Sequence, residues 1–269
     1  MADDHVEELA GFSHYAFDGP AENRKTVYHR GPDDRPGVIL LHELPGMVEE
    51  CVTLGTELST AAEGFEAFQV HMPLLFGSPN QNGGPIDSAK ALWCMRNEMS
   101  LLSASKPSPI TRWVAALAED VATRTGVDRV GVIGMCLTGS LVFGLAADTN
   151  VGAVVASQPS LPFAFTPAKR RSLGMPKAAI RDAADSASPM LAMRYRKDIA
   201  CPRRRLEELA DAYGGRFDRP ETDIPQDETI GNLRIREIPG RKHALLTLHR
   251  DDETVEVVKR FLTESLSSA

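Results

Sequence analysis

Short apolar segments recur along the chain, separated by polar stretches that contain glycine and proline. Residues 37–42 are continuously apolar, which is typical of a strand covered on both faces of a sheet. Similar runs predict further strands at residues 65–71, from residue 129 to the turn at residue 136, and at 151–157, 189–195 and 233–238.

Helical patterns lie between these strands. Residues 48–62 and 110–125 are followed by Gly64 and Gly126, which are typical helix stops, and further helices are predicted at 141–147, 202–213 and 252–266. The alternation predicts an α/β fold with a doubly wound, mainly parallel sheet and helices on both faces, in one domain over residues 1–269.

Other segments carry weaker patterns. Residues 1–36 are polar and allow an edge hairpin at 13–17 and 25–29. Residues 86–109 suggest a helix followed by an irregular excursion over the strand ends, residues 167–188 are polar, and residues 218–229 form an acidic loop.

A glycine-flanked turn, Gly-Met-Cys-Leu-Thr-Gly at residues 134–139, joins a predicted strand to a predicted helix. Such a turn holds its corner residue in a strained conformation, and glycines on both sides relieve the crowding. The corner residue is Cys136, where the helix dipole favours a thiolate, so the segment predicts a nucleophile elbow with cysteine in the usual place of serine. Taken alone, a small buried thiol without chemistry is an equally good interpretation.

Two nucleotide-binding interpretations of the same glycines fail. A phosphate loop requires lysine where Ser140 stands, and a dinucleotide-binding turn requires a glycine spacing that Gly131, Gly134 and Gly139 do not have.

The formal net charge of −7 argues against a nucleic acid or an anionic membrane as partner. The basic triplet at residues 203–205 is followed by Glu207 and Glu208 at helical spacing, which predicts a solvated, paired helix face.

The four cysteines are scattered, which predicts free thiols. With no apolar leader or membrane-spanning run, we expect a cytoplasmic protein. No His, Cys and carboxylate cluster has metal-ligand spacing, so neither a metal nor a cofactor is expected.

A cysteine nucleophile needs a base, and His243 follows the strand at 233–238, as the chain order nucleophile, acid, histidine requires. The acid should leave a strand between the two, and Asp198 does so after residues 189–195. Asp218, Asp223 and Asp227 are rivals that no predicted strand delivers to the sheet edge. The other histidines lie in the polar N-terminal section, on strands before the nucleophile, or at the solvent-facing entry to the last helix: His5, His14, His29, His42, His71 and His249.

An acyl-transfer site also needs backbone donors for an oxyanion. The N–H of Leu137, directly after the nucleophile, is one candidate. The N–H of Leu44, in the loop after the strand at 37–42, is the other.

With Cys136 in its elbow, the His42-Glu43-Leu44-Pro45-Gly46 loop, Asp198 and His243, the chain resembles the dienelactone hydrolase family of α/β-hydrolases from about residue 37 to residue 262. The resemblance implies that the Glu43 carboxylate holds the resting thiol protonated and away from His243 until substrate displaces it. The alternative is that Glu43 is merely a surface or supporting carboxylate.

The sequence also departs from that family. Thr138 replaces the usual glycine two residues after the cysteine, and we expect its branched side chain to tighten the approach to the next strand and shift the Leu137 N–H. The arginines that bind the dienelactone carboxylate are missing from residues 72–76 and 244–247, which favours a less charged substrate, because a carboxylate without a partner is costly to desolvate. Leu75, Phe76 and Trp93 are candidate pocket walls, although each is also suited to ordinary core packing.

These features predict a hydrolase of a small carboxylic ester or lactone that uses Cys136, His243 and Asp198. A thioesterase or acyl transferase with the same residues is the nearest alternative. A catalytically silent binding protein of the same fold and a peroxide-sensing role for Cys136 are more distant ones.

Overall fold

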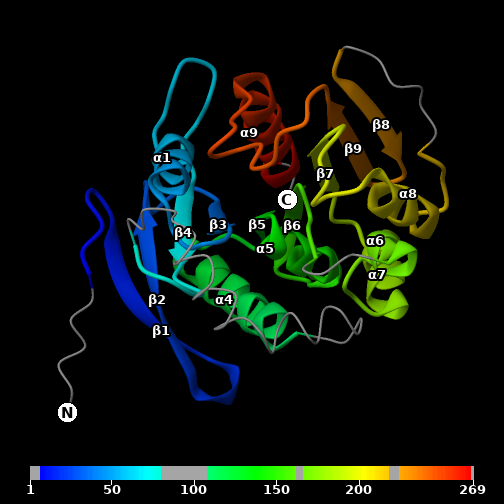
Figure 1. The fold of residues 1–269 in the computed structure, drawn as a ribbon. Helices are drawn as coiled ribbons and strands as arrows, with labels where there is room; N and C mark the ends of the chain where they lie inside the picture. Colours follow the sequence, from blue (N-terminus) through cyan, green and yellow to red (C-terminus); the bar gives the residue numbers. More distant parts are fainter. Residues whose placement is uncertain (1–6, 80–107, 162–165, 218–223, 268–269) are drawn as a thin grey trace.

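The structure, a computed structural model, describes residues 7–79, 108–161, 166–217 and 224–267. In these residues nine strands form one sheet in the order β1-β2-β4-β3-β5-β6-β7-β9-β8 (Figure 1). The parallel strands are β4 (Gln69–Pro73), β3 (Gly37–Leu41), β5 (Val130–Met135), β6 (Val151–Ser157), β7 (Met190–Tyr195) and β9 (Leu233–Ile238). Their carboxyl ends therefore meet at one edge of the sheet.

Antiparallel strands flank this parallel core. β1 (Ser13–Gly19) and β2 (Asn23–Arg30) form the predicted edge hairpin, and β2 pairs with β4. On the other edge, β8 (Gln226–Ile230) pairs with β9. β8 was not predicted, because its acidic sequence and half-exposed side chains are typical of a loop.

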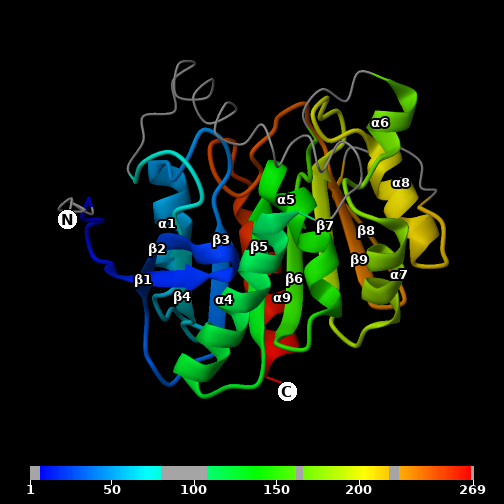
Figure 2. The same ribbon diagram turned by 90° about the horizontal axis from the view of Figure 1, so that it is seen from below.

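Helices cover both faces of the sheet (Figures 1 and 2). On one face lie α1 (Glu49–Leu58) and α9 (Asp252–Leu266). On the other lie α4 (Pro109–Thr125), α5 (Leu137–Leu141), the 3-10 helix η2 (Val142–Ala147), α7 (Lys177–Asp185) and α8 (Arg203–Ala212), with α6 (Pro167–Arg171) against α8. None of the described helices is both long and apolar enough to cross a bilayer.

Strand β3 explains why the central strands are continuously apolar. Val38 and Leu40 pack with α1 and α9, while Ile39 and Leu41 pack with α4 and α5, and all four are fully buried. Because successive side chains of a strand point to opposite faces, a strand between two helical layers needs apolar residues at every position.

Most predicted elements are confirmed, and the exceptions have local causes. The strand predicted at 65–71 begins only at Gln69, and the helix predicted at 141–147 starts directly after Cys136 and changes to 3-10 geometry at Val142. The polar segment at 167–188 contains α6 and α7, which were missed because only Ile180 and Ala183 of α7 are buried. Most of the predicted excursion at 86–109 lies outside the described residues.

Candidate active site

Cys136 lies at the sharp turn between β5 and α5. Its backbone has φ 54° and ψ −117°, a strained conformation for any residue with a side chain. A Cβ on Gly134 would lie 2.5 Å from the carbonyl oxygen of Thr138, so only glycine fits before the turn. Backbone hydrogen bonds of Cys136 with Ser157 and Ser160 hold the strained corner in place. The local geometry is that of the predicted nucleophile elbow.

Thr138 connects this turn to the end of β3. Its hydroxyl oxygen accepts the N–H of Met135 at 2.9 Å, and its proton is within reach of the carbonyl oxygens of Leu41, His42 and Met135. The side chain is fully buried and faces β3, whereas Gly139 makes the close approach to β6. The expectation that Thr138 tightens the approach to the next strand was therefore wrong. Thr138 instead links the two loops that carry the predicted oxyanion donors.

Asp198 and His243 form a direct pair. The Nδ1–H of His243 donates to Asp198 Oδ2 at 2.7 Å. The other carboxylate oxygen of Asp198 accepts the backbone N–H groups of Ala200 and Cys201, which fixes the carboxylate in its loop. Asp198 is therefore placed to orient the imidazole.

The loops that carry this pair are held together by the sheet. The N–H of Arg196 donates to the carbonyl of Ile238 and that of Lys197 to the carbonyl of Gly240, which extends the β7–β9 pairing beyond the strands. Gly240 has φ 135°, and a Cβ there would lie 3.0 Å from the ring of Tyr195. Only glycine allows this approach of the two loops.

The surroundings of His243 favour its protonated form. Burial opposes its protonation, but the Asp198 carboxylate and the Cys136 thiol outweigh burial and raise the pKa of His243 to about 11. Its Nε2 atom is buried and makes no hydrogen bond of standard geometry with any described residue, although the Cys136 thiol is close enough to affect its pKa.

Glu43 points into the same site from the loop after β3. Its residue is only 5% exposed, and its carboxylate accepts hydrogen bonds from the Thr247 hydroxyl and, at 3.4 Å, from the Gln158 amide. Burial raises the pKa of Glu43, and the hydrogen bonds from Thr247 and Gln158 oppose that rise. The side chains that donate hydrogen bonds to this carboxylate are neutral, and the nearby His243 also opposes the rise of its pKa.

Gln158 and Thr247 were not predicted as site residues. Gln158 follows β6 directly, and its Oε1 accepts both the Ser157 hydroxyl and the N–H of Leu245, so it joins the loops of Glu43 and His243. The rule that chemistry gathers at the carboxyl ends of parallel strands was sufficient to find Gln158. No pattern in the sequence indicates that Thr247 reaches Glu43.

The structure brings Glu43, Cys136 and His243 into one cluster. One carboxylate oxygen, the sulfur and one ring nitrogen all lie within 4.8 Å of one another. The spacing of residues along the sequence does not indicate this cluster, because its members are far apart in sequence and meet only at the sheet edge.

The sequence profile of the dienelactone hydrolase family matches residues 26–216. The chain belongs to the dienelactone hydrolase family. It is a hydrolase with the predicted α/β-hydrolase fold. The matched range contains Glu43, Cys136 and Asp198, and His243 lies beyond it.

Solved structures share the fold of this family member. A proposed dienelactone hydrolase from Klebsiella pneumoniae is 18% identical with a TM-score of 0.62, over 96% of this chain and 99% of that one. An esterase from Pyrococcus furiosus is 12% identical with a TM-score of 0.63, over 97% and 98% of the two chains. Esterase 2 from Thermogutta terrifontis is 16% identical with a TM-score of 0.56, over 96% of each chain. Comparison with the curated proteins gives no match.

The loop after β4 packs against the end of β3, next to Glu43. His42 Nε2 accepts the N–H of Leu75 at 3.0 Å, and the Phe76 ring packs edge-on against His42. Burial lowers the pKa of His42 to about 4, so it is a neutral packing residue. Leu75 and Phe76 are buried in the hydrophobic core. This agrees with ordinary core packing, the alternative to their role as pocket walls. Trp93 lies outside the described residues.

The rival acids and bases lie elsewhere or outside the described residues. Asp227 is on β8 and pairs with Arg234 and Arg236, while Asp218 and Asp223 lie outside the described residues. His249 was expected to face solvent, but it is half-buried and its Nδ1 bonds to the carbonyl of His243. It therefore shapes the loop of the predicted base.

The basic triplet is only partly as predicted. Arg203 pairs with Glu207 at 3.2 Å, but Arg205 is fully buried, contrary to the expected solvated face. The Arg205 guanidinium donates to backbone carbonyls of loops around the site, those of Pro159, Lys169, Ser172 and Ala200. It anchors α8 and α6 against the loops after β6 and β7.

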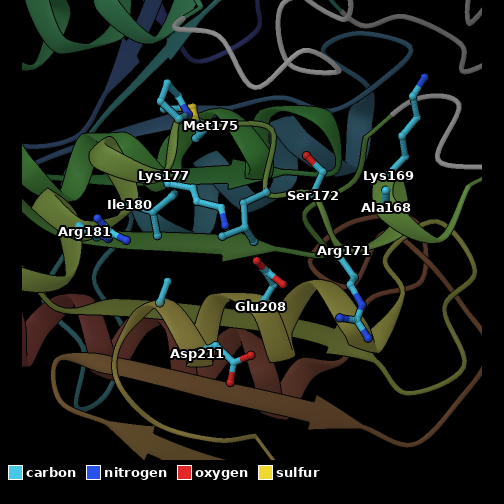
Figure 3. A pocket seen from close by; sticks show the side chains of 13 residues that line it. Ala168, Lys169, Arg171, Ser172, Met175, Lys177, Ile180, Arg181, Glu208 and Asp211 are labelled. Atoms are coloured by element: carbon cyan, nitrogen blue, oxygen red, sulfur yellow. The ribbon is translucent and has the colours of Figure 1, made fainter.

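A separate cavity of about 800 Å³ lies between α6, α7 and α8 (Figure 3). Cationic side chains from α6 and α7 and carboxylates from α8 line it, namely Lys169, Arg171, Lys177, Arg181, Glu208 and Asp211. None of the described residues predicted for catalysis lines this cavity, so it is not the site of the predicted chemistry.

Proposed function

We propose that this member of the dienelactone hydrolase family hydrolyses small, uncharged carboxylic esters or lactones through an acyl-cysteine on Cys136. The observation that carries the proposal is the arrangement around the sulfur. A ring nitrogen of His243 lies within 4.8 Å of it, and Nδ1 of the same ring is bonded to Asp198. A nucleophile, a base and a group that orients the base are the parts that acyl transfer requires.

In the proposed reaction the proton of Cys136 has already passed to His243, and the Cys136 sulfur attacks the ester carbonyl as the thiolate. The N–H groups of Leu44 and Leu137 stabilise the oxyanion, and His243 returns the proton to the leaving alcohol. Water, activated by His243, then attacks the acyl-cysteine and releases the acid and the thiol. The Leu137 N–H is suited to its role because it is the first of α5 and has no acceptor within its own helix.

Glu43 is proposed to compete with His243 for the thiol. Its carboxylate oxygen, held by Thr247 and Gln158, lies within 4.8 Å of both the sulfur and the imidazole. The thiol proton can therefore be shared with Glu43 until the carbonyl of a substrate enters beside the sulfur.

An uncharged substrate is supported by the absence of arginine from residues 72–76 and 244–247. A substrate carboxylate would have no arginine there to bind, and a carboxylate without a partner is costly to desolvate. We expect p-nitrophenyl butyrate to be cleaved with a higher kcat/KM than the matched succinate ester that carries a free carboxylate. The reverse order would contradict this substrate class.

The test of the mechanism is intact-mass analysis after mixing with p-nitrophenyl butyrate. The wild type should show a transient butyryl adduct and turnover, and Cys136→Ala should show neither. Cys51→Ala is the matched control, because Cys51 is a fully buried thiol of α1 outside the proposed machinery. If the wild type forms no adduct and cleaves no ester in a small panel, the proposed function is wrong.

Acyl transfer and thioester hydrolysis would use the same residues. Adding propanethiol or propanol as a competing acceptor distinguishes them, because a hydrolase keeps the free acid as its main product. A main product that contains the acceptor would instead identify a transferase.

A further inference from the structure

The cluster of Glu43, Cys136 and His243 has the donor atoms that zinc prefers. Zn²⁺ binds cysteine sulfur, histidine nitrogen and carboxylate oxygen in tetrahedral geometry, with bonds of about 2.0–2.3 Å. Ligand atoms in such a site lie roughly 3.5 Å apart. The three donors already lie within 4.8 Å of one another, so side-chain shifts of about 1 Å suffice to enclose an ion.

The histidine is oriented as in many zinc sites. Its Nδ1–H is bonded to Asp198, so Nε2 is the nitrogen that can bind zinc once its own proton is released, and Nε2 is buried without a hydrogen bond of standard geometry to any residue in the described ranges. A carboxylate on the far ring nitrogen fixes the tautomer and orientation of a zinc-binding histidine and increases its basicity.

The carboxylate is supported in the same way. Thr247 and Gln158 each donate one hydrogen bond to Glu43, one to each oxygen, and each oxygen keeps a further lone pair. Both donors are neutral, so the negative charge of Glu43 is available to a cation. Groups that hydrogen-bond to a metal ligand contribute to affinity, and their loss typically lowers it 10- to 100-fold.

We propose that Glu43, Cys136 and His243 bind one Zn²⁺ ion reversibly, and that the bound ion blocks the nucleophile. The proton shared by the Cys136 sulfur and His243 Nε2 is released to solvent, and both atoms then bond to zinc, so the sulfur is unavailable for attack on a carbonyl. A thiolate ligand favours zinc over magnesium or calcium, which prefer oxygen. The blocking effect rests on the proposed function, whereas binding of the ion does not.

Binding is tested with Co²⁺ as a spectroscopic substitute on metal-free protein. One equivalent should produce a thiolate-to-cobalt charge-transfer band in the near ultraviolet, which one equivalent of Zn²⁺ removes. Cys136→Ala should lose the band. Thr247→Val should keep it but lower Zn²⁺ affinity 10- to 100-fold, measured by competition with a chromophoric chelator. Cys51→Ala should match the wild type.

Several outcomes would overturn the zinc site. These are a band that survives in Cys136→Ala, binding that is not stoichiometric, or a Glu43→Gln variant with unchanged zinc affinity. Circular dichroism and urea unfolding of each variant confirm that it is folded.

Failure of the two proposals can be told apart. An acyl adduct without a cobalt band refutes the zinc site alone, and a cobalt band without an acyl adduct refutes the hydrolase mechanism alone. If both hold, equimolar Zn²⁺ should abolish p-nitrophenyl butyrate cleavage and EDTA should restore it.

Discussion

Individual side chains in this site act through hydrogen bonds to loops that are distant in sequence. Thr138 joins the elbow to the end of β3, and Gln158 joins the loops of Glu43 and His243. Each is buried, so each bond is made without competition from water. Substitutions that keep the shape but remove the polar atom are therefore informative.

Replacing Thr138 by valine removes the hydroxyl and keeps the branched shape. The N–H of Met135 then loses the hydroxyl oxygen as its acceptor, and we expect a loss of about 1–3 kcal/mol in unfolding free energy. Because the turn also positions the Leu137 N–H, kcat for ester cleavage should fall as well. Urea unfolding and steady-state kinetics measure the two effects. Thr138→Ser should be close to wild type, and equal losses in both variants would show that the methyl group matters rather than the hydroxyl.

Replacing Asp198 by asparagine tests the orientation of His243. The asparagine oxygen is needed to accept the N–H groups of Ala200 and Cys201, so the NH2 group faces His243. It donates to Nδ1, which then carries no proton, and the imidazole loses its productive tautomer. We expect kcat to fall on the order of 10³- to 10⁴-fold with a small change in KM. The matched control is Asp227→Asn, whose carboxylate lies on β8, and an equal loss in that control would contradict the assigned role.

At the scale of the elements, the pairing of β7 with β9 carries a buried ion pair. Arg194 and Glu237 are partners in the strand register, and their side chains are 2% and 0% exposed with an Nη1–Oε1 distance of 2.8 Å. Arg196 and Arg203 also face Glu237. The pairing delivers the loops of Asp198 and His243, so its stability bears on the site.

Replacing Glu237 by glutamine should destabilise the protein by about 3–5 kcal/mol, because Arg194 would stay buried without a countercharge. Glu256→Gln is the control, since the Glu256 side chain is 61% exposed on α9 where it pairs with Lys259, and its loss should change stability by less than about 1 kcal/mol. Urea unfolding compares the two variants. Similar small effects in both would mean that the buried pair is not needed for the β7–β9 pairing.

For the molecule as a whole, buried histidines make stability depend on pH. Burial is the main cause that lowers the pKa of His42 to about 4 and that of His71 to about 3, with the neighbouring His29 and Arg124 adding to the effect at His71. His71 is neutral between the side chains of Tyr15 and Gln69. In the unfolded chain both histidines have an ordinary pKa near 6.5. Below that pH they therefore bind protons in the unfolded chain while they stay neutral in the folded protein.

The contribution of His42 and His71 to stability should therefore be complete above about pH 6.5 and be lost as the pH drops towards 4. At pH 5 each of the two histidines should lower the unfolding free energy by about 2 kcal/mol. Urea midpoints at pH 7 and pH 5 test this in the wild type and in His71→Gln. The variant should lose less stability over that interval, and an identical loss would contradict the assignment to His71.

The sequence by itself determined the α/β alternation, the elbow at Cys136 and the chain order of Cys136, Asp198 and His243. These features are local: continuous apolar runs fix strands buried on both faces, glycines fix the sharp turn, and a residue that follows a parallel strand must lie at the sheet edge. The amphipathic α9 and the Gly126 stop of α4 were predictable for the same reason.

Only the tertiary structure decided what lies beside those residues. Thr247 bonds to Glu43 across more than two hundred positions of sequence, Thr138 faces β3 rather than β6, and Arg205 is buried among carbonyls instead of solvated. The common reason is that a buried polar side chain forms hydrogen bonds with the loop that lies next to it, and the order of strands in the sheet decides which loop that is. That order depends on the packing of the whole chain, which also brings Glu43, Cys136 and His243 together as possible metal ligands.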